Sequence, residues 1–247
     1  MSTKRDGIDS IDLQSGIDIA IPLEFGGAQP AFFGANPAIQ SNYQTGNFTG
    51  STQLGASCNV AVVTVTPHCN GTHTECAGHI TLDPIYVSEI PAIVFSPALL
   101  VTVNGDSPIE ASHLESFLDR YNDVIETLVI RTTPNENSKR HRNYDREPAT
   151  WFHPDAISLI VAQGLRHLVV DLPSIDPADS TDLPAHHEFW SVRDGSVVNE
   201  AGRSRTITEM VFVPDSILDG RYAFCNSWPL LETDASPSRP VLFRYRD

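Results

Sequence analysis

The segment from residue 93 to residue 171 alternates apolar runs with helical patterns, and this alternation restricts the chain to few folds. Its runs typical of buried strands are Ile93 to Val103, Leu128 to Arg131 and His167 to Asp171. Its amphipathic helical patterns are Pro108 to Tyr121 and Pro154 to Gln163, the second with proline in its first turn and Gly164 behind it. The β-α-β order predicts an α/β fold.

The remaining chain favours one domain that spans residues 1–247. A chain of 247 residues can bury one substantial core, and it contains no internal repeat, low-complexity tract or Pro/Gly-rich linker. Its first third indicates short strands, because Gly16 to Pro22 alternates and Asn59 to Val65 is β-branched and apolar. The charged stretch Ser138 to Glu147 is interpreted as a solvated loop, with a lid over an anionic substrate as the alternative.

Charge and hydropathy exclude several classes of protein. The formal net charge is -15, from 16 basic and 31 acidic residues, which disfavours a nucleic-acid partner. The N-terminal stretch has no apolar run typical of a signal peptide, and no segment of the chain is long and apolar enough to span a membrane. We therefore expect a cytoplasmic protein without a membrane partner, in which the four cysteines are reduced.

The segment Pro67 to Ile80 concentrates side chains that bind metals. Within PHCNGTHTECAGHI, three histidines, two cysteines and one glutamate are all capable ligands. His73 and Glu75 are two residues apart, so both project to one face if the segment is extended, and Cys69 has the same parity. His79 can reach the same point if the chain turns. The density predicts a metal site, although each residue taken singly could be an ordinary core residue.

This segment resembles the signature H-x-G-T-H-x-D-x-P-x-H of the metal-dependent cyclase family, which includes bacterial kynurenine formamidase and isatin hydrolase. The residues that match directly are Gly71, Thr72, His73 and His79. Glu75 stands where the family has Asp, and Ala77 where it has Pro. The resemblance implies a swivelling β/β/α domain around a small barrel-like sheet, and a homo-oligomer, either a dimer or a tetramer.

The resemblance continues downstream. Residues 171–176 (DLPSID) are similar to the family's D-x-x-S-[IV]-D stretch, and residues 236–239 (SPSR) to its S-P-x-R. It implies His186, in LPAHH, and Glu200, in VVNE, as further metal ligands. The complete ligand set that we expect is Cys69, His73, Glu75, His79, His186 and Glu200. His79 and Glu200 are the expected catalytic residues, and His79 is also the candidate for proton transfer because histidine titrates near neutrality.

Two departures from the family pattern leave alternatives open. Cys69 occupies the register of the family's first histidine, whereas His68 lies one residue too early, so either side chain could be the ligand. Glu75 is one methylene longer than the family's Asp, which shifts its carboxylate by about 1.5 Å. A Cys69 thiolate would favour zinc, and manganese is the alternative metal. The number of metal ions, one or two, stays open.

A bound divalent metal would activate water toward an amide, formamide, lactam or lactone of a small substrate. The sequence therefore predicts a metal-dependent hydrolase that resembles arylformamidases. The alternatives are a binding or regulatory member of the family that has lost its chemistry, and a cyclase or dehydratase of secondary metabolism. The aromatic residues that could line a pocket for an aromatic substrate, or simply pack in the core, are Phe32, Phe33, Phe189 and Trp190.

Overall fold

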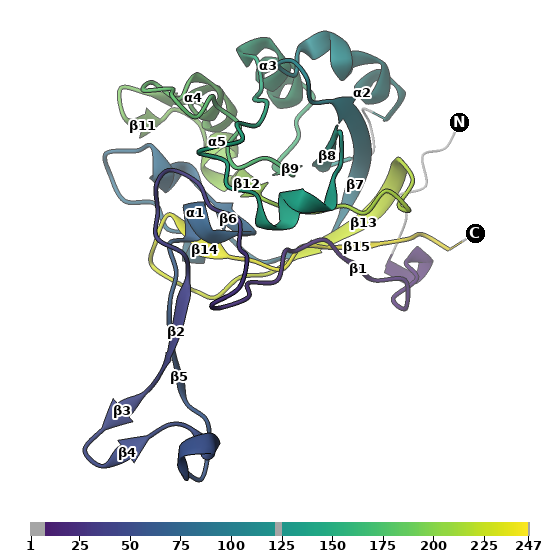
Figure 1. The fold of residues 1–247 in the computed structure, drawn as a ribbon. Helices are drawn as coiled ribbons and strands as arrows, with labels where there is room; N and C mark the ends of the chain where they lie inside the picture. Colours follow the sequence, from purple (N-terminus) through teal and green to yellow (C-terminus); the bar gives the residue numbers. More distant parts are fainter. Residues whose placement is uncertain (1–7, 122–124, 247) are drawn as a thin grey trace.

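Nine strands form one strongly curved sheet in the order β1-β15-β13-β7-β8-β9-β12-β6-β14. Its strands are β1 (Ile17–Asp18), β6 (His73–Glu75), β7 (Ile93–Asn104), β8 (Thr127–Thr133), β9 (His167–Val170), β12 (Thr206–Glu209), β13 (Gly220–Asn226), β14 (Ala235–Pro237) and β15 (Val241–Phe243). The computed structural model describes residues 8–121 and 125–246. In Figure 1 the sheet curls into a half-barrel, as the resemblance implied.

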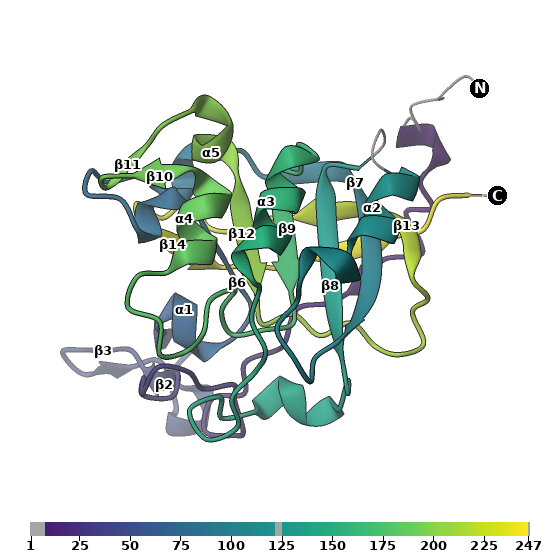
Figure 2. The same cartoon turned by 90° about the horizontal axis from the view of Figure 1, so that it is seen from above.

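The centre of the sheet is parallel, because helical crossovers connect its strands. β7, β8, β9 and β12 pair in parallel, and the strands on both sides of them pair antiparallel. The helices are α1 (Pro67–Asn70), α2 (Glu115–Tyr121), α3 (Pro154–Ala162), α4 (Pro184–Trp190) and α5 (Glu200–Ser204). Helices α2, α3 and α4 lie along one face of the parallel strands (Figure 2). The predicted β-α-β order is confirmed.

Several element boundaries differ from those expected. The helix expected from residue 108 begins as a 3-10 turn, η5 (Ala111–His113), before α2. Its first turn is closed by Glu110 N–H donating to His113 Nδ1. The other 3-10 turns are η1 (Ile8–Ser10), η2 (Thr52–Leu54), η3 (Ala77–His79), η4 (Val87–Glu89) and η6 (Asn137–His141), and β10 (Val192–Arg193) pairs with β11 (Ser196–Val197).

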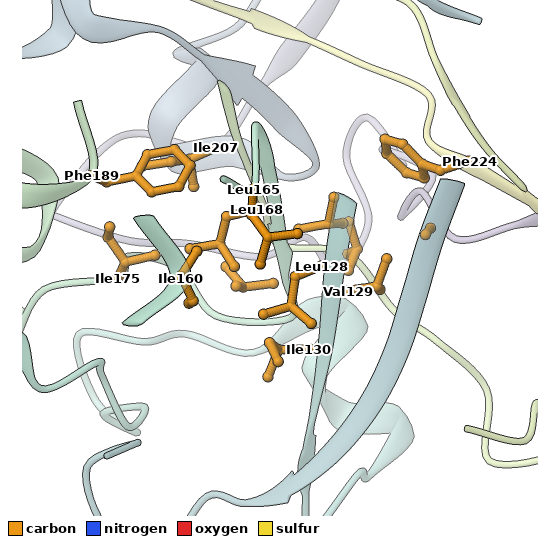
Figure 3. Packing of buried hydrophobic residues seen from close by; sticks show 14 of the residues in the cluster. Leu128, Val129, Ile130, Ile160, Leu165, Leu168, Ile175, Phe189, Ile207 and Phe224 are labelled. Carbon is orange, nitrogen blue, oxygen red and sulfur yellow. The ribbon is translucent and has the colours of Figure 1, made fainter. Parts of the chain in front are cut away.

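The core lies on both faces of the parallel strands. Leu128, Val129 and Ile130 of β8 are all buried. Figure 3 shows Leu128 among Ile160 of α3 and Leu168 of β9. Both faces are covered because helices pack on one and the curled sheet folds over the other, as in other parallel sheets. This rigid core holds the ends of β6 and β12, where the candidate site lies.

The strand expected from Asn59 to Val65 is real but is not part of the core. β5 (Ala61–Thr64) pairs with β2 (Ile39–Asn42), and all eight residues of this pair are exposed. Residues 39–64, which also hold β3 (Gln44–Thr45) and β4 (Phe48–Thr49), extend from the body as a two-stranded ribbon (Figure 1). We call residues 39–64 the arm. Its β-branched composition predicted a strand correctly, but strand propensity does not specify burial.

The charged loop of residues 138–147 is less solvated than expected. Lys139 is buried, and its Nζ donates to Asp171 Oδ2 at 2.7 Å and to Thr132 O at 2.6 Å. A buried ammonium requires such partners, so the loop is tied to the ends of β8 and β9.

Within residues 8–121 and 125–246, no helix is long and apolar enough to cross a bilayer. Residues 1–7, part of the stretch judged not to be a signal peptide, lie outside the described residues. The cytoplasmic location and the lack of a nucleic-acid partner stay predictions.

Candidate metal centre

Strand β6 supplies the two residues at the middle of the site. His73 and Glu75 are completely buried and alternate with Thr74, so their side chains share one face of the sheet. β6 lies between β12 and β14, and the antiparallel register places Glu209 opposite His73. The parity argument for His73 and Glu75 therefore led to the correct geometry.

Three buried side chains, His73, Glu75 and Glu209, meet at the Glu209 end of β12. His73 Nε2 lies 3.4 Å from Glu209 Oε2, while His73 Nδ1 donates to Gly71 O at 2.9 Å. That hydrogen bond fixes the ring with Nε2 directed toward the carboxylates. Nε2 has no hydrogen-bond partner in the described part of the chain, although it is buried. A buried imidazole nitrogen that faces carboxylates without a hydrogen bond is the geometry of a metal ligand.

Glu75 occupies the centre of the cluster. Its Oε1 lies 3.2 Å from His186 Nε2, and its Oε2 lies 3.1 Å from His68 Nδ1 and 3.9 Å from His79 Nδ1. Both oxygens are buried, and neither accepts a hydrogen bond of good geometry from the described residues. Four histidines from α1, β6, η3 and α4 thus converge around this carboxylate.

His68, and not Cys69, faces the cluster. Residues 67–70 form one turn of helix, α1, where successive side chains rotate by about 100° and strand parity does not apply. His68 Nδ1 points to Glu75, and its Nε2 donates to Asp234 Oδ2 at 2.8 Å. Cys69 is buried beside the site, and burial raises the pKa of its thiol, which opposes thiolate formation. The structure thus favours the second alternative that the sequence left open.

Glu200 lies outside the cluster, and Glu209 lies where the ligand was expected. Glu200 is exposed at the start of α5. Among residues 8–121 and 125–246, ligand atoms close enough to share an ion form two groups, His68-Glu75-His79 and His73-Glu75-Glu209. Neither group includes Glu200 or Cys69. The resemblance pointed to the glutamate of VVNE, whereas Glu209 ends the strand TITE nine residues later.

Two aspartates that sequence reasoning missed orient the histidines. Asp176 is buried, and its Oδ2 accepts from His186 Nδ1 at 2.6 Å and from His186 N–H at 3.0 Å. In the sequence, Asp176 is only the last residue of the DLPSID stretch, without an assigned role. Asp234, just before β14, contacts His68 and also His79 Nδ1, at 3.3 Å. Such carboxylate-histidine pairs fix the tautomer and orientation of metal-binding imidazoles.

The charges of the cluster are strongly coupled. Burial opposes the protonation of His68 and His186, but hydrogen bonds to Asp234 and Asp176, together with Glu75, raise each histidine's pKa to about 10. Burial also opposes the ionisation of Glu75, yet the surrounding histidines hold its pKa well below the usual range. Burial and the nearby Glu75 carboxylate raise the pKa of Glu209.

The donor set fits a divalent metal. Neutral imidazoles and carboxylates are ligands for zinc and for manganese. A cation at this position would displace the histidine protons and relieve the repulsion between the two buried carboxylates. Glu75 belongs to both groups of candidate ligands.

The aromatic residues considered for a pocket differ in environment. Phe189 and Trp190 are completely buried, and the Trp190 ring lies 5.4 Å from the ring of His186. Phe32 packs in a small cluster with Tyr144 and Met210, whereas Phe33 is 74% exposed with a φ of 57°. Core packing therefore accounts for Phe189, and Phe33 lies on the surface.

A buried cluster of imidazoles and carboxylates on a half-barrel sheet makes this an α/β protein with a candidate metal centre. Residues 17–177 match the family model described as "Putative cyclase", and the chain belongs to the cyclase family. It is 30% identical over 195 residues to the kynurenine formamidases of Bacillus cereus and Bacillus mycoides, covering 78% of this chain and 83% of each relative.

Solved structures share the fold. Isatin hydrolase A from Labrenzia aggregata has a TM-score of 0.67 at 13% identity, and the match covers 94% of both chains. A predicted metal-dependent hydrolase from Bacillus stearothermophilus has a TM-score of 0.64 at 18% identity, covering 92% of this chain and 97% of that one. The predicted family and fold are therefore confirmed.

Proposed function

We propose that this chain is an arylformamidase-like hydrolase that cleaves the amide bond of a small aromatic substrate with the help of a divalent metal. The observation that carries the proposal is Glu75, a buried carboxylate at the meeting point of four histidines and Glu209 that accepts no hydrogen bond of good geometry from the described residues. The similarity to kynurenine formamidases supports the substrate class. Lactams and lactones of similar size are the related substrates to be compared.

We propose zinc as the metal, with manganese as the alternative. The residues that would hold it are His68, His73, Glu75, His186 and Glu209, and His79 lies beside them. Several imidazoles in one site favour zinc over magnesium or calcium, which prefer oxygen ligands. A bound divalent ion would lower the pKa of a water molecule toward neutrality and polarise the substrate carbonyl.

His79 is the residue proposed to move protons. Its side chain is 27% exposed, whereas His73 and His186 are buried. Its Nδ1 contacts Asp234 Oδ2, which orients the ring and leaves Nε2 as the nitrogen for proton transfer. His79 can accept a proton from the attacking water and donate it to the departing amine nitrogen, which needs protonation to leave.

The experiment is a comparison of substrates and metals. The protein, purified without added metal, is analysed for metal content and assayed with N-formylkynurenine and with isatin. We expect zinc or manganese at one or two ions per chain, formamide hydrolysis that a chelator abolishes, and recovery when metal is restored. Metal-free protein with unchanged stability after chelation, and no hydrolysis of either compound, would refute the proposal and favour the binding or regulatory alternative.

We also propose that the chain forms a homo-oligomer through the arm. An isolated two-stranded hairpin is marginally stable in water, yet the arm exposes Ile39, Val62 and Val63 at 57%, 43% and 49%. A partner surface would cover these apolar side chains, and the resemblance to the family implies that the partner is a second copy of this chain.

We expect light scattering to give a dimer or tetramer. Val62→Lys should shift this oligomer toward monomer, whereas Gln44→Lys, on the same arm, should not. A monomeric unmodified protein would refute this proposal.

A further inference from the structure

A cavity of about 530 Å³ lies away from the metal ligands, at the amino ends of the parallel strands. Residues that line it include Glu126 before β8, His167 at the start of β9 and Ser204 before β12. The metal ligand Glu209 is at the other end of β12, three residues beyond Thr206, a separation of about 10 Å along an extended strand. No step of the proposed hydrolysis uses this cavity.

One wall of the cavity is apolar and has an unusual backbone. Ile90, Ile93 and Phe95 belong to it. The pairing of β7 with β13 changes register here, and Phe95 has a φ of 57°. A bulge re-aims side chains, and a left-handed conformation is costly for a phenylalanine, so the surrounding structure must enforce it. Both features are common at binding sites.

A buried imidazole contributes to the polar side of the cavity. His167 is 6% exposed, and its Nδ1 is paired with Thr206 Oγ1 at 2.9 Å. Its Nε2 has no hydrogen-bond partner within residues 8–121 and 125–246. His167 lines the cavity, so this nitrogen is available to a ligand group there.

Acidic groups outnumber basic groups around the cavity. Glu89 pairs with Arg203 at 2.8 Å, and Glu126 lies 4.0 Å from Arg166. Glu200 also lines the cavity, and it makes no ion pair in the described part of the chain. An adjoining cavity of about 380 Å³ shares Glu200 and Arg203 with the first and adds the carboxylate of Asp83.

We propose that this cavity is a second ligand site, which binds a small aromatic amine in its cationic form. The apolar wall would cover the ring, and Glu200 would pair with the ammonium group. A cation is favoured over an anion because each arginine at the site already has a carboxylate neighbour, whereas Glu200 has no cationic partner. This proposal does not depend on the hydrolase activity.

The experiment is calorimetric titration of the full chain with three compounds that share an indole ring: tryptamine, 3-ethylindole and indole-3-propionate. We expect tryptamine to bind most tightly and indole-3-propionate least. Glu200→Gln should raise the Kd of tryptamine about three- to five-fold, the effect of one partly exposed charge pair. Glu115→Gln, on the exposed surface of α2, should leave the Kd unchanged.

A second variant tests the location independently of charge. Ala92 is exposed at the rim of the cavity, and Ala92→Trp should abolish tryptamine binding while leaving the melting temperature unchanged. Binding of tryptamine that is equal in Glu200→Gln, Ala92→Trp and the unmodified protein would place the amine elsewhere and overturn the proposal. Tighter binding of indole-3-propionate than of tryptamine, or no binding of tryptamine, would overturn it too.

Discussion

Replacing Glu209 by glutamine tests whether this residue, rather than Glu200, holds the metal. Glu209 is 3% exposed, and its carboxylate lies 3.4 Å from His73 Nε2 and 3.9 Å from His186 Nε2. Glutamine keeps the shape of the side chain and removes its charge. Changes to groups that only support a ligand weaken metal binding by about 10- to 100-fold, so the loss of a ligand charge should cost about 100-fold or more.

This loss of affinity can be read from stability. With metal at 100 times the Kd of the unmodified protein, binding adds about 2.7 kcal/mol to the free energy of unfolding, and a 100-fold weaker Kd removes most of it. For a domain of this size, the melting temperature of the metal-bound protein should therefore fall by about 5 to 10 °C. The assay is calorimetric unfolding with and without zinc, together with direct titration of zinc.

The metal-free protein supplies the discriminating control. Burial and the neighbouring Glu75 raise the pKa of Glu209, so its charge is disfavoured when no cation is present. Glu209→Gln should consequently leave the melting temperature of the metal-free protein unchanged or raise it. Glu200→Gln, at an exposed position, should change neither zinc affinity nor stability. Equal zinc affinity in Glu209→Gln and the unmodified protein, or a comparable loss in Glu200→Gln, would refute the assignment.

Three further predictions concern other residues. Asp176→Asn should weaken zinc binding about 10- to 100-fold in a titration, because the amide lacks the charge that holds His186 Nδ1 and has one acceptor oxygen where Asp176 uses two. His68→Ala should lower zinc occupancy measured by elemental analysis, whereas Cys69→Ser should not, because only the imidazole faces Glu75. Burial lowers the pKa of His167 to about 3, so below pH 6.5 the unfolded chain binds a proton on this histidine that the folded chain does not. The free energy of unfolding should therefore fall as the pH drops from 6.5 to 4.5, by up to about 1.4 kcal/mol per pH unit from this histidine. His167→Asn should reduce that loss.

Each of these predictions has an outcome that contradicts it. Unchanged zinc affinity in Asp176→Asn would show that His186 needs no anchoring. Equal zinc loss in Cys69→Ser and His68→Ala would return the thiol to the ligand set. For the pH dependence, the control is His153→Asn, at a histidine whose side chain is 56% exposed, and an identical acid profile for His167→Asn and this control would contradict the predicted proton uptake.

The sequence by itself determined the chemistry of the site and the central architecture. The β-α-β order of residues 93–171 specified a parallel sheet, because buried strands and amphipathic helices have different periods. The density of His, Cys and Glu in residues 67–80 indicated a metal, and the alternation of His73 and Glu75 placed both on one face of a strand. These inferences needed only local periodicity and the affinity of side chains for cations.

Only the tertiary structure decided which distant residues complete the site. His68 replaces Cys69 because residues 67–70 form a helical turn, whose side-chain directions do not follow strand parity. Glu209 and Asp234 reach the cluster because β12 and β14 pair with β6 on its two edges. Strand register across a sheet is set by packing between segments far apart in the sequence, and no local pattern in TITE or ETDA contains that information.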